Sequence, residues 1–120
     1  MVENASATVE KTAETPAVTL FEASPRDGLQ NEKRAISTEN KVKLIDLLAV
    51  SGLKRIEAAS FVSPRWVPQM ADGAEVMARI RRVPGVKFAA LTPNLRGLEA
   101  AIAAKTDEVS VFASASEGFS

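Results

Sequence analysis

Residues 55–60 read RIEAAS, a short apolar run that carries one acidic residue and follows a segment of helical periodicity. In that segment, from about Thr38 to Val50, apolar residues recur at steps of three and four, which predicts an amphipathic helix. Thr38 is the expected N-cap of this helix and Gly52 its C-terminal stop. The RIEAAS run is expected to be a strand, so the two segments predict one helix–strand unit.

A second helical segment follows the strand, after a polar connection over residues 61–69. This helix is expected to begin near Asp72, because Glu75 lies three residues further on, as in a capping box. It is expected to end at Gly85, with a buried stripe formed by Val76, Met77, Ile80 and Val83.

The same alternation continues on both sides of these elements. Further strands are expected at Val18–Ala23, Lys87–Leu91 and Glu108–Ala113, and a third helix is expected to open at Pro93-Asn94, with Leu95, Leu98 and Ile102 on one face. Strands that alternate with helices predict right-handed parallel βαβ units. A doubly wound sheet and a (βα)-barrel both fit this order. No G-x-G-x-x-G follows any of these strands, which weakens the dinucleotide-binding form of the doubly wound sheet.

The composition of the chain argues against several classes of function. The 120 residues carry no net charge, which argues against nucleic-acid and anionic-lipid partners, and no apolar run approaches the length of a membrane span. The chain has neither Cys nor His, so any acid–base or metal chemistry must come from carboxylates, Lys, Arg, amides or hydroxyls. Residues 1–16 are polar without a signal or transit pattern, and are expected to be a disordered tail on a cytoplasmic protein.

In a barrel, reactive residues lie at the C-terminal ends of strands and in the loops that follow. Arg26 and Asp27 follow the first strand: Asp can bind a hard divalent cation, and Arg can stabilise charge that develops on a carbonyl oxygen. The alternative is a solvated surface ion pair. Glu57 lies within the second strand, either as a carboxylate near Arg26 or a metal, or at a strand edge facing water.

Other polar and aromatic residues in the loops are more ambiguous. Lys33 and Arg34 could meet the phosphates of an anionic substrate, although solvated surface cations are the better interpretation. Trp66 could cover a ligand, but packing of its loop is favoured. Asn94 is expected to be the N-cap of the third helix.

Three stretches of sequence are more specific evidence for a protein family than the spacing of the predicted elements. They are SPRDGLQNE at 24–32, EAASFVSPRWVPQM at 57–70 and LTPNLRG at 91–97. In this order they resemble hydroxymethylglutaryl-CoA lyases, over about Val18 to Phe119. A shorter RDG pattern with a later Gln also marks isopropylmalate and homocitrate synthases. The resemblance implies an α/β TIM (βα)8 barrel, of which residues 17–120 supply about the first half. It also implies a divalent cation, Mg²⁺ or Mn²⁺, and cleavage of hydroxymethylglutaryl-CoA to acetyl-CoA and acetoacetate.

The resemblance assigns roles to individual residues. Asp27 matches the metal-binding aspartate, and Arg26 matches the catalytic arginine that steadies the thioester enolate of the departing acetyl-CoA. The implied substrate-binding residues are Arg26, Gln30, Lys33, Glu57 and Ser60, with Lys33 near the CoA side.

The family's other metal ligands, two histidines and an asparagine, and its catalytic cysteine lie on later strands and loops. Activity is therefore expected of a full-length, homo-oligomeric parent that binds an acyl-CoA, and not of these 120 residues alone. A related barrel acyl-CoA lyase or synthase and a non-catalytic truncated half-barrel are the alternatives.

Overall fold

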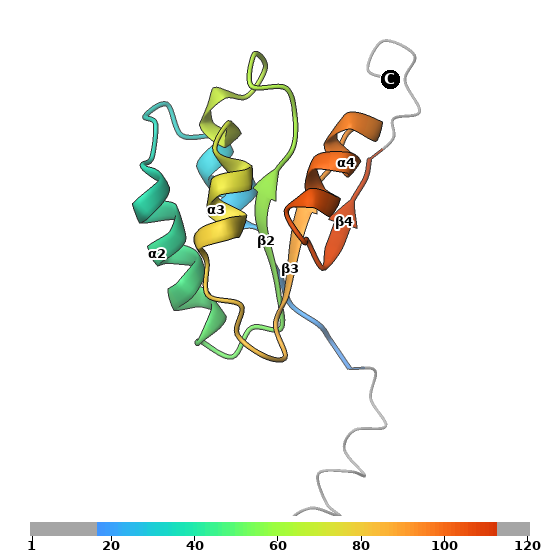
Figure 1. Ribbon diagram of the computed structural model, residues 1–120. Coiled ribbons are helices and arrows are strands. Elements are labelled where there is room, and N and C mark those ends of the chain that lie inside the picture. Colours follow the sequence, from blue (N-terminus) through green and yellow to red (C-terminus); the bar gives the residue numbers. More distant parts are fainter. Residues whose placement is uncertain (1–16, 113–120) are drawn as a thin grey trace, which may run out of the picture.

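The computed structural model describes residues 17–112, which form a parallel four-stranded sheet with helices between successive strands (Figure 1). The predicted disordered tail at 1–16 lies outside the described residues, and so do Ser114 and Ser116, two polar residues that follow the last predicted strand. The strands are β1 (Phe21–Glu22), β2 (Arg55–Ser60), β3 (Lys87–Leu91) and β4 (Glu108–Ser110), and the longer helices are α2 (Thr38–Ala49), α3 (Gly73–Arg79) and α4 (Leu95–Ala103). Two short helical turns, η1 (Ser24–Gly28) and η2 (Pro68–Met70), complete the order.

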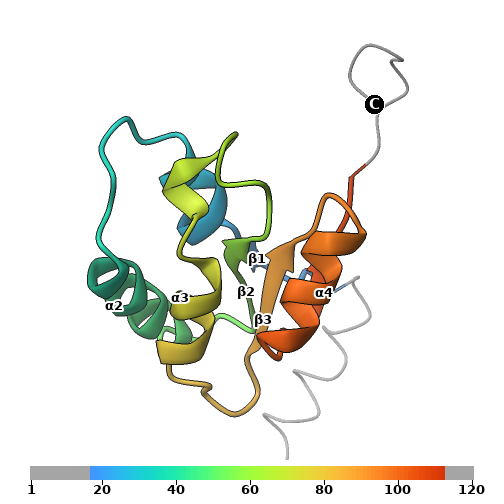
Figure 2. The ribbon, with the colours of Figure 1, turned by 45° about the horizontal axis from the view of Figure 1, so that its top comes forward.

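The strand order distinguishes the two architectures that the sequence allows. Each strand pairs in parallel with the next one along the chain, in the order β1-β2-β3-β4. A doubly wound sheet instead reverses its order at a switch point and carries helices on both faces. Figures 1 and 2 show α2, α3 and α4 along one face of the sheet, which leaves the other face open. The described residues therefore form part of a (βα)8 barrel, and the predicted fold class is confirmed.

The hydrophobic core lies between the sheet and the helices α2 and α3. Ile56 and Phe88 are register partners on neighbouring strands, and both are fully buried. They pack in one cluster with Ile45, Val76 and Met77 from the helices. Burial of such side chains contributes about 1.5–3 kcal/mol each. This face of the sheet is therefore the helix-covered, outer face of the barrel.

A β-bulge in β2 determines which polar side chains reach the opposite face. Glu57 pairs with Ala89 and Ser60 pairs with Leu91, while the register shifts between Glu57 and Ala59. Ala89 and Leu91 are two residues apart and so share a face of β3. Glu57 and Ser60, three residues apart, therefore share that face too, which regular alternation would not allow. Bulges commonly re-aim side chains in this way beside active sites.

Several predicted strand and helix ends are wrong. The predicted first strand Val18–Ala23 pairs with β2 only through Phe21 and Glu22, because the chain turns into η1 directly afterwards. The predicted last strand ends at Ser110, and Ala113 lies outside the described residues. The helix α3 ends at Arg79 rather than at Gly85, because the backbone N–H of Arg81 donates to Asp46 Oδ1 of α2 instead of continuing the helix (2.8 Å).

The predicted caps are corrected in two of three cases. Ser37, not Thr38, caps α2, and its hydroxyl accepts a hydrogen bond from the Asn40 N–H. Asp72 precedes α3 but makes no capping bond, so the predicted capping box with Glu75 is absent. Asn94 does cap α4, accepting from the Gly97 N–H at 2.8 Å.

The packing of α4 also differs from its apolar pattern. Its buried residues are Gly97 and Ala101, whereas Leu95 and Ile102 are exposed in the described structure. A Cβ on Gly97 would lie 2.7 Å from the Phe61 carbonyl oxygen, so this glycine permits a close approach between α4 and the segment after β2. Within residues 17–112, no helix is long and apolar enough to cross a membrane.

Candidate functional site

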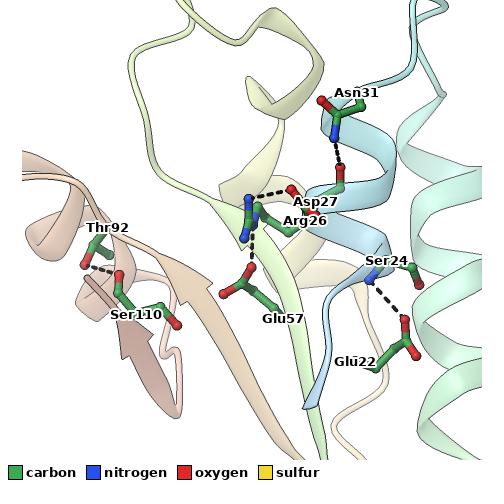
Figure 3. A network of polar contacts seen from close by, with 8 residues as sticks. All are labelled: Glu22, Ser24, Arg26, Asp27, Asn31, Glu57, Thr92 and Ser110. Carbon is green, nitrogen blue, oxygen red and sulfur yellow. Dashed lines mark hydrogen bonds and ion pairs between the residues drawn. The ribbon is translucent and has the colours of Figure 1, made fainter. Parts of the chain in front are cut away.

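The candidate site lies where the C-terminal ends of the parallel strands meet (Figure 3). The chain leaves β1 through η1, a five-residue π-helical turn in which the Asp27 N–H donates to the Ala23 carbonyl at 2.7 Å. The side-chain amide of Asn31 donates to the Asp27 carbonyl at 2.9 Å and braces the same turn. Wide turns of this kind occur often at functional sites. Here the turn directs the Arg26 side chain toward β2.

Arg26 and Glu57 form a part-buried ion pair across this end of the sheet. The Arg26 Nε donates to Glu57 Oε1, and the two side chains are 19% and 3% exposed. A carboxylate buried to this degree requires a partner, which the guanidinium supplies. Glu57 therefore does not face water at a strand edge. Its position next to Arg26 is the first of the two arrangements that the sequence allows.

Asp27 lies on the other side of the same guanidinium. Its Oδ1 is 3.2 Å from Arg26 Nη1, and its side chain is 62% exposed. Two carboxylates against one guanidinium leave this group of three side chains with one negative charge. The uncompensated charge lies on the open carboxylate, Asp27, because Glu57 is buried against Arg26.

A hard divalent cation prefers oxygen ligands, and several oxygen donors lie at this end of the sheet. Asp27 supplies an accessible carboxylate. The buried Oε1 of Gln30 and Oγ of Ser60 lack a hydrogen-bond partner among the described residues. No group of three or more His, Cys, Asp or Glu that could hold a metal occurs within residues 17–112. The oxygen donors therefore fit such a cation in kind, and a third His, Cys, Asp or Glu ligand would come from outside the described residues.

The remaining predicted residues are placed differently. Lys33 is exposed in the loop after η1, and within the described structure no hydrogen bond or ion pair joins it to Arg26, Asp27 or Glu57. Trp66 is 84% exposed, so the favoured interpretation that it packs its loop is wrong for the described part of the chain. Thr92, from the LTPNLRG stretch, is buried after β3, and its hydroxyl donates to the Ser110 carbonyl at 3.4 Å (Figure 3).

Two further charged clusters are absent from the sequence-based predictions. Arg55 makes a bidentate ion pair with Glu108 on the open face of the sheet, at 2.8 and 3.0 Å, and stacks over the Phe21 ring. Lys41 is buried at the start of α2. Its position four residues before the buried Ile45 places it on the inner face of the helix, which is the signal that predicts its burial.

Comparison with known proteins places the chain in a family. The model of the HMGL-like family matches residues 17–120. Hydroxymethylglutaryl-CoA lyase, mitochondrial, of Gallus gallus is 60% identical over 102 residues, covering 85% of this chain and 34% of the relative. The 3-hydroxy-3-isohexenylglutaryl-CoA/hydroxymethylglutaryl-CoA lyase of Pseudomonas aeruginosa is 59% identical, covering 86% and 34%.

Solved structures give the same result. The hydroxymethylglutaryl-CoA lyase of Pseudomonas aeruginosa superposes with a TM-score of 0.80 at 59% identity, covering 85% of this chain and 34% of that one. An HMG-CoA lyase from Acinetobacter baumannii, solved with coenzyme A and 3-methylmalate, gives 0.82 at 42% identity, covering 84% and 33%. The chain thus spans about a third of the length of these relatives. Because the family match extends over nearly all of its length, the chain belongs to the HMGL-like family.

Proposed function

We propose that this chain supplies the N-terminal half-barrel of a carbon–carbon lyase that cleaves hydroxymethylglutaryl-CoA to acetyl-CoA and acetoacetate. The observation that carries the proposal is the guanidinium of Arg26, which Glu57 fixes at the C-terminal barrel end beside an open carboxylate. The names of the relatives support the same substrate class. The activity is proposed for the whole barrel and not for the 120 residues alone.

Arg26 is the proposed catalytic residue. Cleavage leaves negative charge on the thioester oxygen of the departing acetyl group, and a fixed N–H donor that points at that oxygen lowers the barrier. Glu57 engages Nε and Asp27 engages Nη1, so Nη2 is the guanidinium nitrogen without a partner among these two carboxylates, and it is proposed to face substrate. Gln30 and Ser60 are proposed to bind substrate through their unpartnered oxygens, and Lys33 through the anionic part of the acyl-CoA.

Enzymes of this family are metal-dependent. We propose that Asp27 holds a divalent cation, Mg²⁺ or Mn²⁺, which would acidify the tertiary hydroxyl of the substrate when bound. This assignment is consistent with the uncompensated negative charge beside Arg26. The homo-oligomeric state and the cytoplasmic location remain predictions. Relatives named as mitochondrial and as cytoplasmic both occur.

A second acyl substrate follows from one relative. The Pseudomonas aeruginosa protein is named for both hydroxymethylglutaryl-CoA and 3-hydroxy-3-isohexenylglutaryl-CoA. The two acyl groups share the carbons that react and differ in the substituent at the tertiary carbon. Arg26 and Asp27 are assigned to the shared part, so they serve either substrate equally.

The test is an assay of a completed barrel, in which residues 1–120 are joined to the part of the Pseudomonas aeruginosa lyase beyond the match. With Mg²⁺ and hydroxymethylglutaryl-CoA we expect acetoacetate to form. Asp27→Ala is expected to lower the rate at least about 100-fold and to weaken Mn²⁺ binding measured by electron paramagnetic resonance. Glu99→Ala, which removes an exposed carboxylate from α4, is the matched control. A completed barrel that folds without forming acetoacetate would contradict the proposal.

A further inference from the structure

Lys41 is a buried cation that the proposed chemistry does not use. Its side chain, near the start of α2, is 6% exposed. An ammonium group is costly to bury unless it is paired and hydrogen-bonded. Lys41 Nζ donates to Asp72 Oδ1 at 2.6 Å and to the backbone carbonyl of Gln69. Both acceptors belong to the segment between β2 and α3, so one side chain holds that segment at two points.

The carboxylate of Asp72 stays ionised in this environment. Burial raises its pKa, but hydrogen bonds from Lys41 and Thr38 and the charge of Lys41 outweigh burial, and the pKa is lowered overall. The Thr38 hydroxyl donates to Asp72 Oδ2 at 2.6 Å. Both carboxylate oxygens are therefore engaged by α2, and this explains why Asp72 does not cap α3.

Gln69 extends the connection to the loop after β1. Its side-chain Nε2 donates to the Glu32 carbonyl at 3.1 Å. Glu32 lies in the loop after η1, between Gln30 and Lys33, and η1 itself carries Asp27. Lys41 fixes the backbone of Gln69, and the side chain of Gln69 fixes the backbone of Glu32. The loops that follow β1 and β2 are thus joined to each other and to α2.

We propose that Lys41 is a positioning residue that holds the loops 29–36 and 61–72 in one arrangement beside the candidate site. It acts through these loops and does not touch substrate. The connection matters because each loop follows a strand that carries candidate site residues, Arg26 and Asp27 after β1 and Glu57 and Ser60 in β2. The kinetic consequence rests on the proposed function, whereas the order of the loops can be measured independently of it.

The order of the loops is tested by limited trypsin digestion of the completed barrel. Arg34 and Arg65 are exposed and lie in the two loops. In Lys41→Met we expect cleavage after both residues to become about tenfold faster, since proteolysis follows the population of the locally opened state. Arg55→Met is the matched control, because it removes a part-buried cation from the ion pair with Glu108 and leaves both loops untouched. Unchanged cleavage in Lys41→Met would overturn the proposal.

The kinetic arm separates a positioning role from a general loss of stability. Lys41→Met is expected to raise KM for hydroxymethylglutaryl-CoA about tenfold with a smaller change in kcat, and Arg55→Met is expected to change neither. Gln69→Met keeps the Lys41–Asp72 pair and breaks the link to Glu32. If Lys41→Met does not fold, this second variant tests whether the link orders the two loops. It should accelerate cleavage at Arg34 and raise KM.

The outcomes distinguish this proposal from the proposed function. Faster cleavage with unchanged KM would overturn the link between loop order and substrate binding. Absence of turnover in the unaltered completed barrel would refute the proposed function, while the digestion pattern of the same variants would still decide whether Lys41 orders the loops.

Discussion

The ion pair between Arg26 and Glu57 makes a quantitative prediction about catalysis. Glu57 is 3% exposed and engages Nε, so its role in the proposed mechanism is to orient the guanidinium and not to touch substrate. A hydrogen bond to a charged group contributes about 1.5–3 kcal/mol. Glu57→Gln keeps the side-chain length and an acceptor oxygen but loses the charge. If about 1–2.4 kcal/mol of that energy holds Arg26 in its reactive position, kcat should fall about 5–50-fold.

The double variant distinguishes orientation from direct contact. Arg26→Met removes the group that Glu57 orients, and it should lower kcat about 10²–10³-fold, as for removal of a donor to a developing oxyanion. Adding Glu57→Gln to Arg26→Met should then cost little or nothing more, because no guanidinium remains to be oriented. The two effects are therefore expected to be strongly non-additive, with a coupling of about 1–2.5 kcal/mol.

The assay is acetoacetate formation by the four proteins of this cycle in the completed barrel at saturating hydroxymethylglutaryl-CoA and Mg²⁺. Each protein is first checked for a cooperative thermal transition, so that loss of activity is not loss of fold. If the two losses instead multiply, Glu57 acts independently of Arg26, and the reasoning from the ion pair is refuted. An unchanged kcat in Glu57→Gln alone would refute it equally.

Three further predictions concern stability. Lys105 is a non-glycine residue at φ 59° at the end of α4, where a left-handed L-residue costs about 1–2 kcal/mol, so Lys105→Gly should stabilise the completed barrel by about 0.5–1 kcal/mol in urea unfolding. Lys105→Ala, which keeps the Cβ, should bring no such gain. Gly97→Ala should destabilise it by about 1–3 kcal/mol, because the new Cβ would meet the Phe61 carbonyl oxygen at 2.7 Å, and an unchanged midpoint would contradict this. The lowered pKa of Asp72 stabilises the fold above its usual value of 3.8, and this stabilisation is lost as pH falls through the lowered folded value. Asp72→Asn should therefore lose stability at pH 7 but little at pH 2, and equal losses at both would exclude this linkage.

Elements whose signals are local follow the sequence closely. The strands β2 and β3 have the predicted bounds, because short apolar runs between turn residues suit buried parallel strands. Asn94 caps α4 as predicted, since a cap depends on contacts within a few residues. The alternation of strands and helices also predicts parallel strands, but it does not distinguish a barrel from a doubly wound sheet.

Elements that depend on tertiary contacts depart from the local pattern. The segment from Asp72 to Glu75 has the spacing of a capping box, but the Lys41 ammonium competes for the Asp72 carboxylate and offers a stronger, charge-assisted bond. The bulge in β2 has no local signal, because Ala58 and Ala59 are equally compatible with regular alternation. That bulge nevertheless decides that Glu57 and Ser60 share one face, so the candidate site could be predicted as a set of residues and not as an arrangement.

Among the part-buried ion pairs of the described residues, one group carries an unmatched negative charge. Lys41 is matched by Asp72 and Arg55 by Glu108, so these part-buried pairs are each neutral. Arg26 instead faces two carboxylates, and the buried one, Glu57, takes its Nε. Asp27 is left as the accessible carboxylate of the group, beside a guanidinium that is already engaged. Adding a cation there would relieve the excess negative charge and release Nη1 of Arg26 from Asp27 toward substrate. Under the proposed function, Arg26 and a cation at Asp27 would therefore compete for one carboxylate, and Mn²⁺ should bind more tightly in Arg26→Met than in the unaltered completed barrel. Equal or weaker binding in the variant would exclude this competition. We expect the tighter binding, because Arg26 and a cation compete for the same carboxylate.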